Sequence, residues 1–218
     1  MLYQKILQLL YPSSCVGCHS LVSPGMIMCP LCTSSIKPVV SLFLSLTQKH
    51  ALPVFAAAAY EGVPKSLLLR KFSQDLLASH QLARLMLNTI SFNILKPDYI
   101  VPIPLHWTRY ARRGFNQSAE IAAVLGKALH IPVLNLLQRK KRTIFQSRLS
   151  KQQRADNLDE AFALSMWYRF KGTTFLKDKN ILLVDDLCTT GSTLKSAARK
   201  LLEVKPTSVA AVVACRAL

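Results

Sequence analysis

The chain has 218 residues, of which 50% are hydrophobic and 18% are charged. This composition is typical of a globular protein with a full core and excludes an intrinsically disordered chain. Lys and Arg outnumber Asp and Glu by 28 to 11, and eleven of these basic residues fall within residues 109–154, beside a single acid. A positive field concentrated in this way attracts phosphate groups, either on a metabolite or along a nucleic acid.

Residues 1–50 are predicted to form a small N-terminal module. The first eleven residues, MLYQKILQLLY, place apolar side chains on one helical face and predict a short packing helix. They contain one lysine and no small-residue cleavage site, which makes them a poor secretion signal, so we expect a cytoplasmic protein. No apolar stretch of the chain reaches the roughly 18 residues that a membrane-spanning helix needs. Residues 33–50 are predicted to be a packed connection.

Four cysteines of this module have the spacing C-x2-C-x10-C-x2-C; they are Cys15, Cys18, Cys29 and Cys32. Each two-residue gap lets a tight turn aim two thiolates at one ion, and two such turns complete a tetrahedral site. The spacing therefore predicts a structural Zn²⁺ in a double zinc ribbon-like module. Disulfides are the competing interpretation, but a reducing compartment disfavours them. A redox C-x-x-C would adjoin a βαβ unit, and no such unit flanks these cysteines.

Residues 51–218 are predicted to form one α/β domain. Apolar strand patterns at 54–60, 98–104, 180–186 and 208–214 alternate with helical patterns at 64–90, 115–130 and 192–204. Within the first helical pattern, the predicted buried face carries Leu76, Leu77, His80, Ala83 and Leu87. This alternation predicts a mostly parallel sheet flanked by helices.

The stretch 181–194, ILLVDDLCTTGSTL, carries the strongest functional signal. Asp185 and Asp186 follow a buried strand, where parallel α/β sheets bind ligands, and adjacent carboxylates require compensation. A cluster of hydroxyls around a glycine then leads into a helix: Thr189, Thr190, Gly191, Ser192 and Thr193. Backbone N–H groups in such a turn bind phosphate, and carboxylates accept hydrogen bonds from sugar hydroxyls. The combination predicts a ribose 5-phosphate ligand, although an acidic helix cap would explain one Asp and one Thr.

This stretch resembles the phosphoribosyl pyrophosphate (PRPP) motif of the type I phosphoribosyltransferases. The resemblance implies that Asp185 and Asp186, the candidate catalytic residues, hold the ribose 2′- and 3′-hydroxyls, and that Thr189 to Thr193 hold the 5′-phosphate. Mg²⁺ would be bound mainly by oxygens of PRPP. Cys188 falls on a variable position of the motif, so we assign it no catalytic role.

Two further stretches, VPIPLHWTRYARRGFNQ (101–117) and RTIFQSRLSKQQRADNLDEAF (142–162), resemble the ComF family of bacterial competence proteins, as do the four cysteines. The predicted pyrophosphate-binding residues in these stretches are Arg109, Arg112, Arg113, Asn116, Gln117 and Arg154. Asn116 is also a candidate helix cap. Residues 142–157 have little apolar periodicity and many basic and amide groups, which favours a mobile flap over the site.

The ComF resemblance implies a role in natural transformation. It implies handling of imported single-stranded DNA, with a helicase and a recombination mediator as protein partners. The candidate DNA-binding residues are Lys140, Lys141, Lys151, Trp107 and Tyr110, since cations follow the backbone and aromatic rings stack on bases. A solvated basic loop and ordinary aromatic packing are the alternatives for these residues. A phosphoribosyltransferase of nucleotide salvage or biosynthesis and a PRPP sensor without turnover remain alternative functions.

Overall fold

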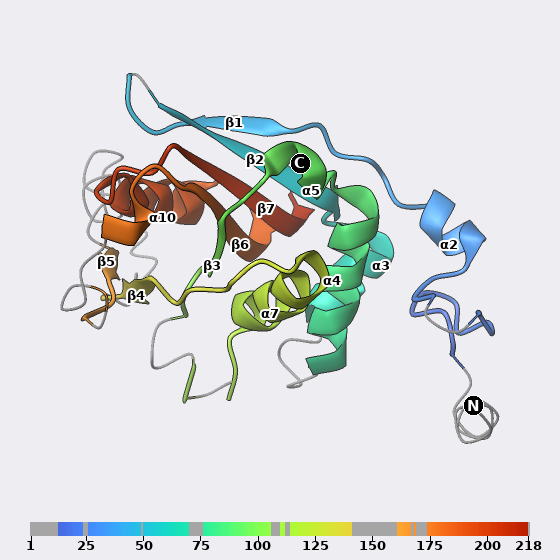
Figure 1. Ribbon diagram of the computed structural model, residues 1–218. Helices are drawn as coiled ribbons and strands as arrows, with labels where there is room; N and C mark the ends of the chain where they lie inside the picture. The colour runs from blue at the N-terminus through green and yellow to red at the C-terminus, as the bar shows by residue number, and fades with distance from the viewer. Residues whose placement is uncertain are drawn as a thin grey trace, which may run out of the picture.

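The computed structural model describes residues 13–23, 26–48, 50–69, 76–105, 110–111, 114–140, 161–166, 168 and 174–217. At its centre is a five-stranded sheet with the strand order β1-β2-β7-β6-β3 (Figure 1). The strands are β1 (Leu42–Ser45), β2 (Ala51–Ala59), β3 (Tyr99–Pro102), β6 (Asn180–Cys188) and β7 (Ser208–Arg216). The last four of these run parallel to one another, and β1 pairs antiparallel with β2. The predicted mostly parallel sheet is confirmed.

Helices cover both faces of the sheet, which explains why its strands are continuously apolar. The helices are α2 (Pro30–Ser34), α3 (Gly62–Leu69), α4 (Leu76–Thr89), α5 (Phe92–Leu95), α7 (Gln117–Leu129) and α10 (Ser192–Leu202), with a 3₁₀ turn, η2 (Thr174–Leu176). Leu182 and Val184 of β6 share one core with α4 and α7, whereas Ile181 and Leu183 share the other with α10. Figure 1 shows α10 on the opposite side of the sheet from α4 and α7. None of the helices within the described ranges is long and apolar enough to cross a membrane.

The sheet begins earlier in the chain than expected, because residues 42–45 pair with β2. These residues belong to the segment 33–50, which was predicted to be a packed connection. The division of the chain at residue 50 stays a prediction, as does the N-terminal helix over residues 1–11, which lies outside the described residues.

A two-stranded antiparallel ribbon follows α7. It consists of β4 (Leu137–Arg139) and β5 (Phe162–Leu164), and the backbone N–H of Lys140 donates to the carbonyl of Ala161 at 3.0 Å. The ribbon brings together the two ends of residues 141–160. The predicted flap over 142–157 falls in that stretch and lies outside the described residues.

The buried face of α4 differs from the predicted one. Leu76, Leu77 and His80 are exposed, and Leu87 is half-buried; of the predicted face only Ala83 is fully buried. The residues that α4 buries instead are Ala78, Ser79, Leu82, Leu85 and Met86. The prediction was wrong because α4 has apolar residues around much of its circumference, and packing against α7 and the sheet selects the face.

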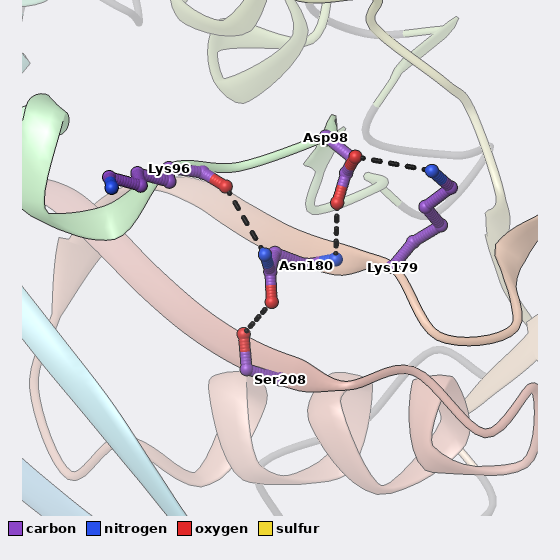
Figure 2. Close-up of polar contacts among 5 residues, drawn as sticks. All are labelled: Lys96, Asp98, Lys179, Asn180 and Ser208. Atoms are coloured by element: carbon purple, nitrogen blue, oxygen red, sulfur yellow. Dashed lines mark hydrogen bonds and ion pairs between the residues drawn. The ribbon is translucent and has the colours of Figure 1, made fainter.

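A polar network links the N-terminal ends of β3, β6 and β7 (Figure 2). The backbone N–H of Asn180 donates to Asp98 Oδ2 at 2.8 Å, and Lys179 Nζ lies 3.4 Å from Asp98 Oδ1. Asn180 Oδ1 accepts from Ser208 Oγ at 2.8 Å, and its Nδ2 donates to the carbonyl of Lys96 at 3.4 Å. The hydrogen bond from Asn180 and the charge of Lys179 hold the pKa of Asp98 below its usual value, against the opposing effect of burial. These contacts set the register of β6 at the end opposite the candidate site.

Candidate functional site

β6 contains both acids and extends two residues beyond the predicted strand 180–186, to Cys188. Leu187 and Cys188 pair with Cys215 and Arg216 of β7, which runs to the same length. Cys188, which lies beyond the predicted strand 180–186, is a strand residue with 2% of its surface exposed. Burial and the nearby negative charge of Asp185 raise the pKa of the Cys188 thiol, although Arg216 opposes the rise. The thiol therefore stays protonated at neutral pH and is a poor nucleophile.

Asp185 is buried, with only 8% of its surface exposed. Its Oδ1 accepts two hydrogen bonds, one from Ser118 Oγ at 2.8 Å and one from the backbone N–H of Asp186 at 2.9 Å. These two donors stabilise the negative charge of the Asp185 carboxylate, which burial and the neighbouring Asp186 both disfavour. Ser118 lies in the first turn of α7 and was not identified from the sequence; its position directly after Asn116 and Gln117 was the available signal.

The hydroxyl cluster surrounds a small hollow at the N-terminus of α10. The hollow has a volume of about 20 Å³, and it is lined by Leu187, Cys188, Thr189, Gly191, Ser192, Thr193 and Leu194. Thr190 Oγ1 donates to Ser192 Oγ at 3.1 Å and accepts from the Ser192 N–H at 3.5 Å, which ties the turn together. Gly191 is the N-cap residue and has no side chain with which to cap the helix. The first N–H groups of α10 can therefore face an anion.

Gly191 has two reasons to be glycine. Its φ is +74°, in the left-handed region, and a Cβ atom built on it would lie 2.5 Å from Leu44 Cδ1. The turn thus lies directly against β1, and Arg199 of α10 strengthens this contact by donating from Nε to the Leu46 carbonyl at 3.0 Å. The hairpin β1–β2 therefore packs against residues 189–193, the candidate phosphate loop.

The remaining predicted residues are placed as follows. Asn116 is the N-cap of α7, as predicted, and its side chain accepts from the Ser118 N–H at 3.2 Å. Gln117 is 3% exposed, and neither of its amide atoms has a hydrogen-bond partner among the described residues. Tyr110 is 53% exposed, and Lys140 is exposed at the end of β4. The predicted residues outside the described ones are Trp107, Arg109, Arg112, Arg113, Lys141, Lys151 and Arg154.

The four N-terminal cysteines converge. Their Sγ atoms all lie within 4.8 Å of one another, and Cys18 Sγ is 3.6 Å from Cys29 Sγ. Sulfurs at the corners of a zinc tetrahedron with Zn–S distances of about 2.3 Å would be about 3.8 Å apart, so the cluster fits this ion. In each pair, a backbone N–H donates to the first thiol at 3.4 Å, from Gly17 to Cys15 and from Cys32 to Cys29.

The environment of Cys15 favours a thiolate. Burial raises its pKa, but hydrogen bonds from the backbones of Cys18, Cys29 and Gly17 outweigh burial and lower the pKa to about 6. Gly17 also lets the module approach α3, since a Cβ atom there would lie 2.7 Å from Val63 Cγ2. Cys15 belongs to the same apolar core as α3 and α4. The cysteine cluster and the α/β fold are therefore packed together.

Comparison with known proteins agrees with the fold. Residues 78–218 match the phosphoribosyl transferase domain family. Competence protein F of Haemophilus influenzae is 34% identical over 146 residues, which cover 63% of this chain and 62% of that protein. Competence protein ComFC of Bacillus subtilis is 36% identical over 116 residues, covering 52% and 43%.

A longer alignment joins this chain to the DNA utilization protein YhgH of Salmonella typhimurium. The two are 30% identical over 216 residues, which cover 94% of this chain and 90% of that protein. The relatives named as competence proteins are matched over less than two thirds of their own length. The chain belongs to the ComF family of phosphoribosyl transferase domain proteins.

Proposed function

We propose that this protein binds PRPP at the carboxyl end of β6 and serves the handling of imported single-stranded DNA. One observation supports the first part: in the chain, Asp185 and Asp186 of β6 immediately precede the residues that line the hollow at the N-terminus of α10. A 5′-phosphate bound by the N–H groups and hydroxyls of residues 189–193 would leave the ribose ring beside the two carboxylates. Asp186, which is half-buried, is the more accessible of the two.

The pyrophosphate of PRPP would then lie toward residues 109–117. Arg109, Arg112 and Arg113 precede α7, and guanidinium groups bind phosphate oxygens bidentately. Arg154, in the stretch proposed as a flap, is a further candidate. Mg²⁺ would neutralise pyrophosphate charge while held mainly by substrate oxygens. Asp185 is already engaged by Ser118 and by the Asp186 N–H, which agrees with a role in orienting sugar rather than in enclosing a metal.

Calorimetric titration with PRPP and Mg²⁺ tests this proposal. Asp186→Asn should weaken binding by about 1.5–3 kcal/mol, or roughly ten- to 150-fold, because one charge-assisted hydrogen bond is lost. Asp186 is replaced alone because the carboxylate of Asp185 is buried and hydrogen-bonded, so that its replacement would also disturb the fold. The matched control is Asp178→Asn, which removes the same charge at an exposed residue with a left-handed backbone that Asn tolerates. Equal PRPP affinity in the Asp186 and Asp178 variants would rule out the ribose role.

The proposed DNA role is supported by the excess positive charge and by the family. Only Lys127, Arg139 and Lys140 of the eleven basic residues in 109–154 lie among the described residues. Lys140 and the half-buried Arg139 stand at the base of the stretch that contains most of the others. Repeating the titration with single-stranded DNA, with and without PRPP, separates a DNA-handling protein from a metabolic transferase. Pyrophosphate release from PRPP with added nucleobases would favour the transferase.

We also propose that Cys15, Cys18, Cys29 and Cys32 hold one structural Zn²⁺. Zinc would cross-link the two cysteine turns, whose residues 13–36 contain no acidic side chain.

A further inference from the structure

One buried side chain of the site comes from an element far away in the sequence. Ser118 is 4% exposed and lies in the first turn of α7, whereas its partner Asp185 lies 67 positions later in β6. The Ser118 hydroxyl and the Asp186 N–H both donate to the same carboxylate oxygen, Oδ1. Two donors on one oxygen remove the rotational freedom that a carboxylate otherwise has about its terminal bond.

A closed circuit of hydrogen bonds holds Ser118 at this position. The Ile103 N–H donates to the carbonyl of Val184 at 2.9 Å, and the Ile103 carbonyl accepts from Asn116 Nδ2 at 3.0 Å. Asn116 Oδ1 accepts from the Ser118 N–H at 3.2 Å, and the Ser118 hydroxyl donates to Asp185 at 2.8 Å. The circuit thus leaves β6 at residue 184 and returns to β6 at residue 185. It ties the N-terminus of α7 to the carboxylate with little freedom for either.

We propose that Ser118 is a positioning residue that presents the Asp185 carboxylate to the ribose of the ligand in one orientation. The inference rests on the proposed PRPP site and deepens it, because it makes discrimination between sugars depend on a residue outside the 181–194 stretch. A carboxylate that is already oriented loses no further entropy when it accepts a sugar hydroxyl, and a misaligned one makes a weaker bond. Removing the Ser118 hydroxyl should therefore act on sugar selectivity and leave phosphate binding in place.

The test compares ribose 5-phosphate with its 2-deoxy and 3-deoxy analogues by calorimetry. The wild-type protein should bind ribose 5-phosphate about tenfold or more tightly than the analogue that lacks the hydroxyl bound by Asp185. In Ser118→Ala this preference should fall about three- to tenfold, while the affinity for that deoxy analogue stays unchanged. Ser118→Thr keeps the hydroxyl and should restore most of the preference.

The matched control is Ser79→Ala on α4. Ser79 is 0% exposed, and its hydroxyl has no hydrogen-bond partner among the described residues, so its removal should change neither affinity nor selectivity. If Ser118→Ala does not unfold cooperatively, Ser118→Cys keeps the volume, replaces the hydroxyl with a weak donor and carries the same expectation.

The outcomes separate this inference from the site on which it rests. If the wild type does not distinguish ribose from either deoxy sugar, the proposed ribose site and the role of Ser118 both fail. If the wild type discriminates between the sugars but Ser118→Ala keeps the preference in full, the role of Ser118 alone is overturned. A uniform loss of affinity for all three ligands in Ser118→Ala would make its role structural and would also overturn the inference.

Discussion

Replacing Gly191 with alanine should destabilise the protein through two separate costs. The first is conformational: at φ +74° a residue with a Cβ atom pays about 1–2 kcal/mol. The second is steric, because the new Cβ atom would lie 2.5 Å from Leu44 Cδ1 and 3.0 Å from Leu44 Cδ2. Leu44 is 7% exposed and packed in the core that includes α10, so moving it adds the overpacking cost of about 1–3 kcal/mol. We expect Gly191→Ala to lower the free energy of unfolding by about 2–5 kcal/mol, the sum of the two costs.

Urea denaturation with two further variants separates the two costs. Gly62→Ala is the matched control, since Gly62 has φ +53° and no atom lies within 4 Å of its added Cβ; it should lose only about 1–2 kcal/mol. In a Leu44→Ala background, Gly191→Ala should likewise cost only the conformational 1–2 kcal/mol or so, because the clash is gone. Equal costs for Gly191→Ala and Gly62→Ala, or a cost at Gly191 that Leu44→Ala does not reduce, would refute the proposed contact between the phosphate loop and β1.

Three other predictions concern different parts of the molecule. Metal analysis should find about one zinc per chain, and chelation should make residues 13–36 sensitive to protease before the sheet unfolds. Unchanged cleavage of that segment after zinc removal would count against a structural ion. The binding constant for single-stranded DNA should fall by about 0.7 log units per released counterion for each log unit of salt. Replacing Lys140, Lys141 and Lys151 together with alanine should flatten this slope, whereas replacing Lys37, Lys65 and Lys177 should not. Asp98→Asn should lower the free energy of unfolding at neutral pH, because the Asn180 N–H and Lys179 lower the pKa of Asp98 in the folded state. The difference in unfolding free energy between wild type and variant should be full above about pH 5 and should shrink as pH falls through that lowered pKa. A difference that does not depend on pH should remain only if the hydrogen bond from Asn180 matters by itself.

Local patterns in the sequence were sufficient for the parallel strands and main helices of the α/β fold and for the turn of the candidate site. The apolar run Ile181–Val184 predicted a buried strand because a strand covered on both faces has no polar side to show. Asn116 predicted the start of α7 because a short polar side chain can cap the helix from the residue before it. The paired spacing of the cysteines predicted their cluster, since each two-residue gap is closed by its own turn.

Only the tertiary structure decided which residues support these elements. β6 continues to Cys188 because β7 offers partners as far as Arg216, and α4 buries the face that α7 and the sheet cover. The hydrogen bond from Ser118 to Asp185 and the contact of Leu44 with Gly191 join residues 67 and 147 positions apart. No local pattern shows that Ser118 contacts Asp185 or that Leu44 contacts Gly191, because packing of the sheet alone brings each pair together. The sequence therefore indicated which residues form the candidate ribose and phosphate site, and the fold determined which residues hold them in place.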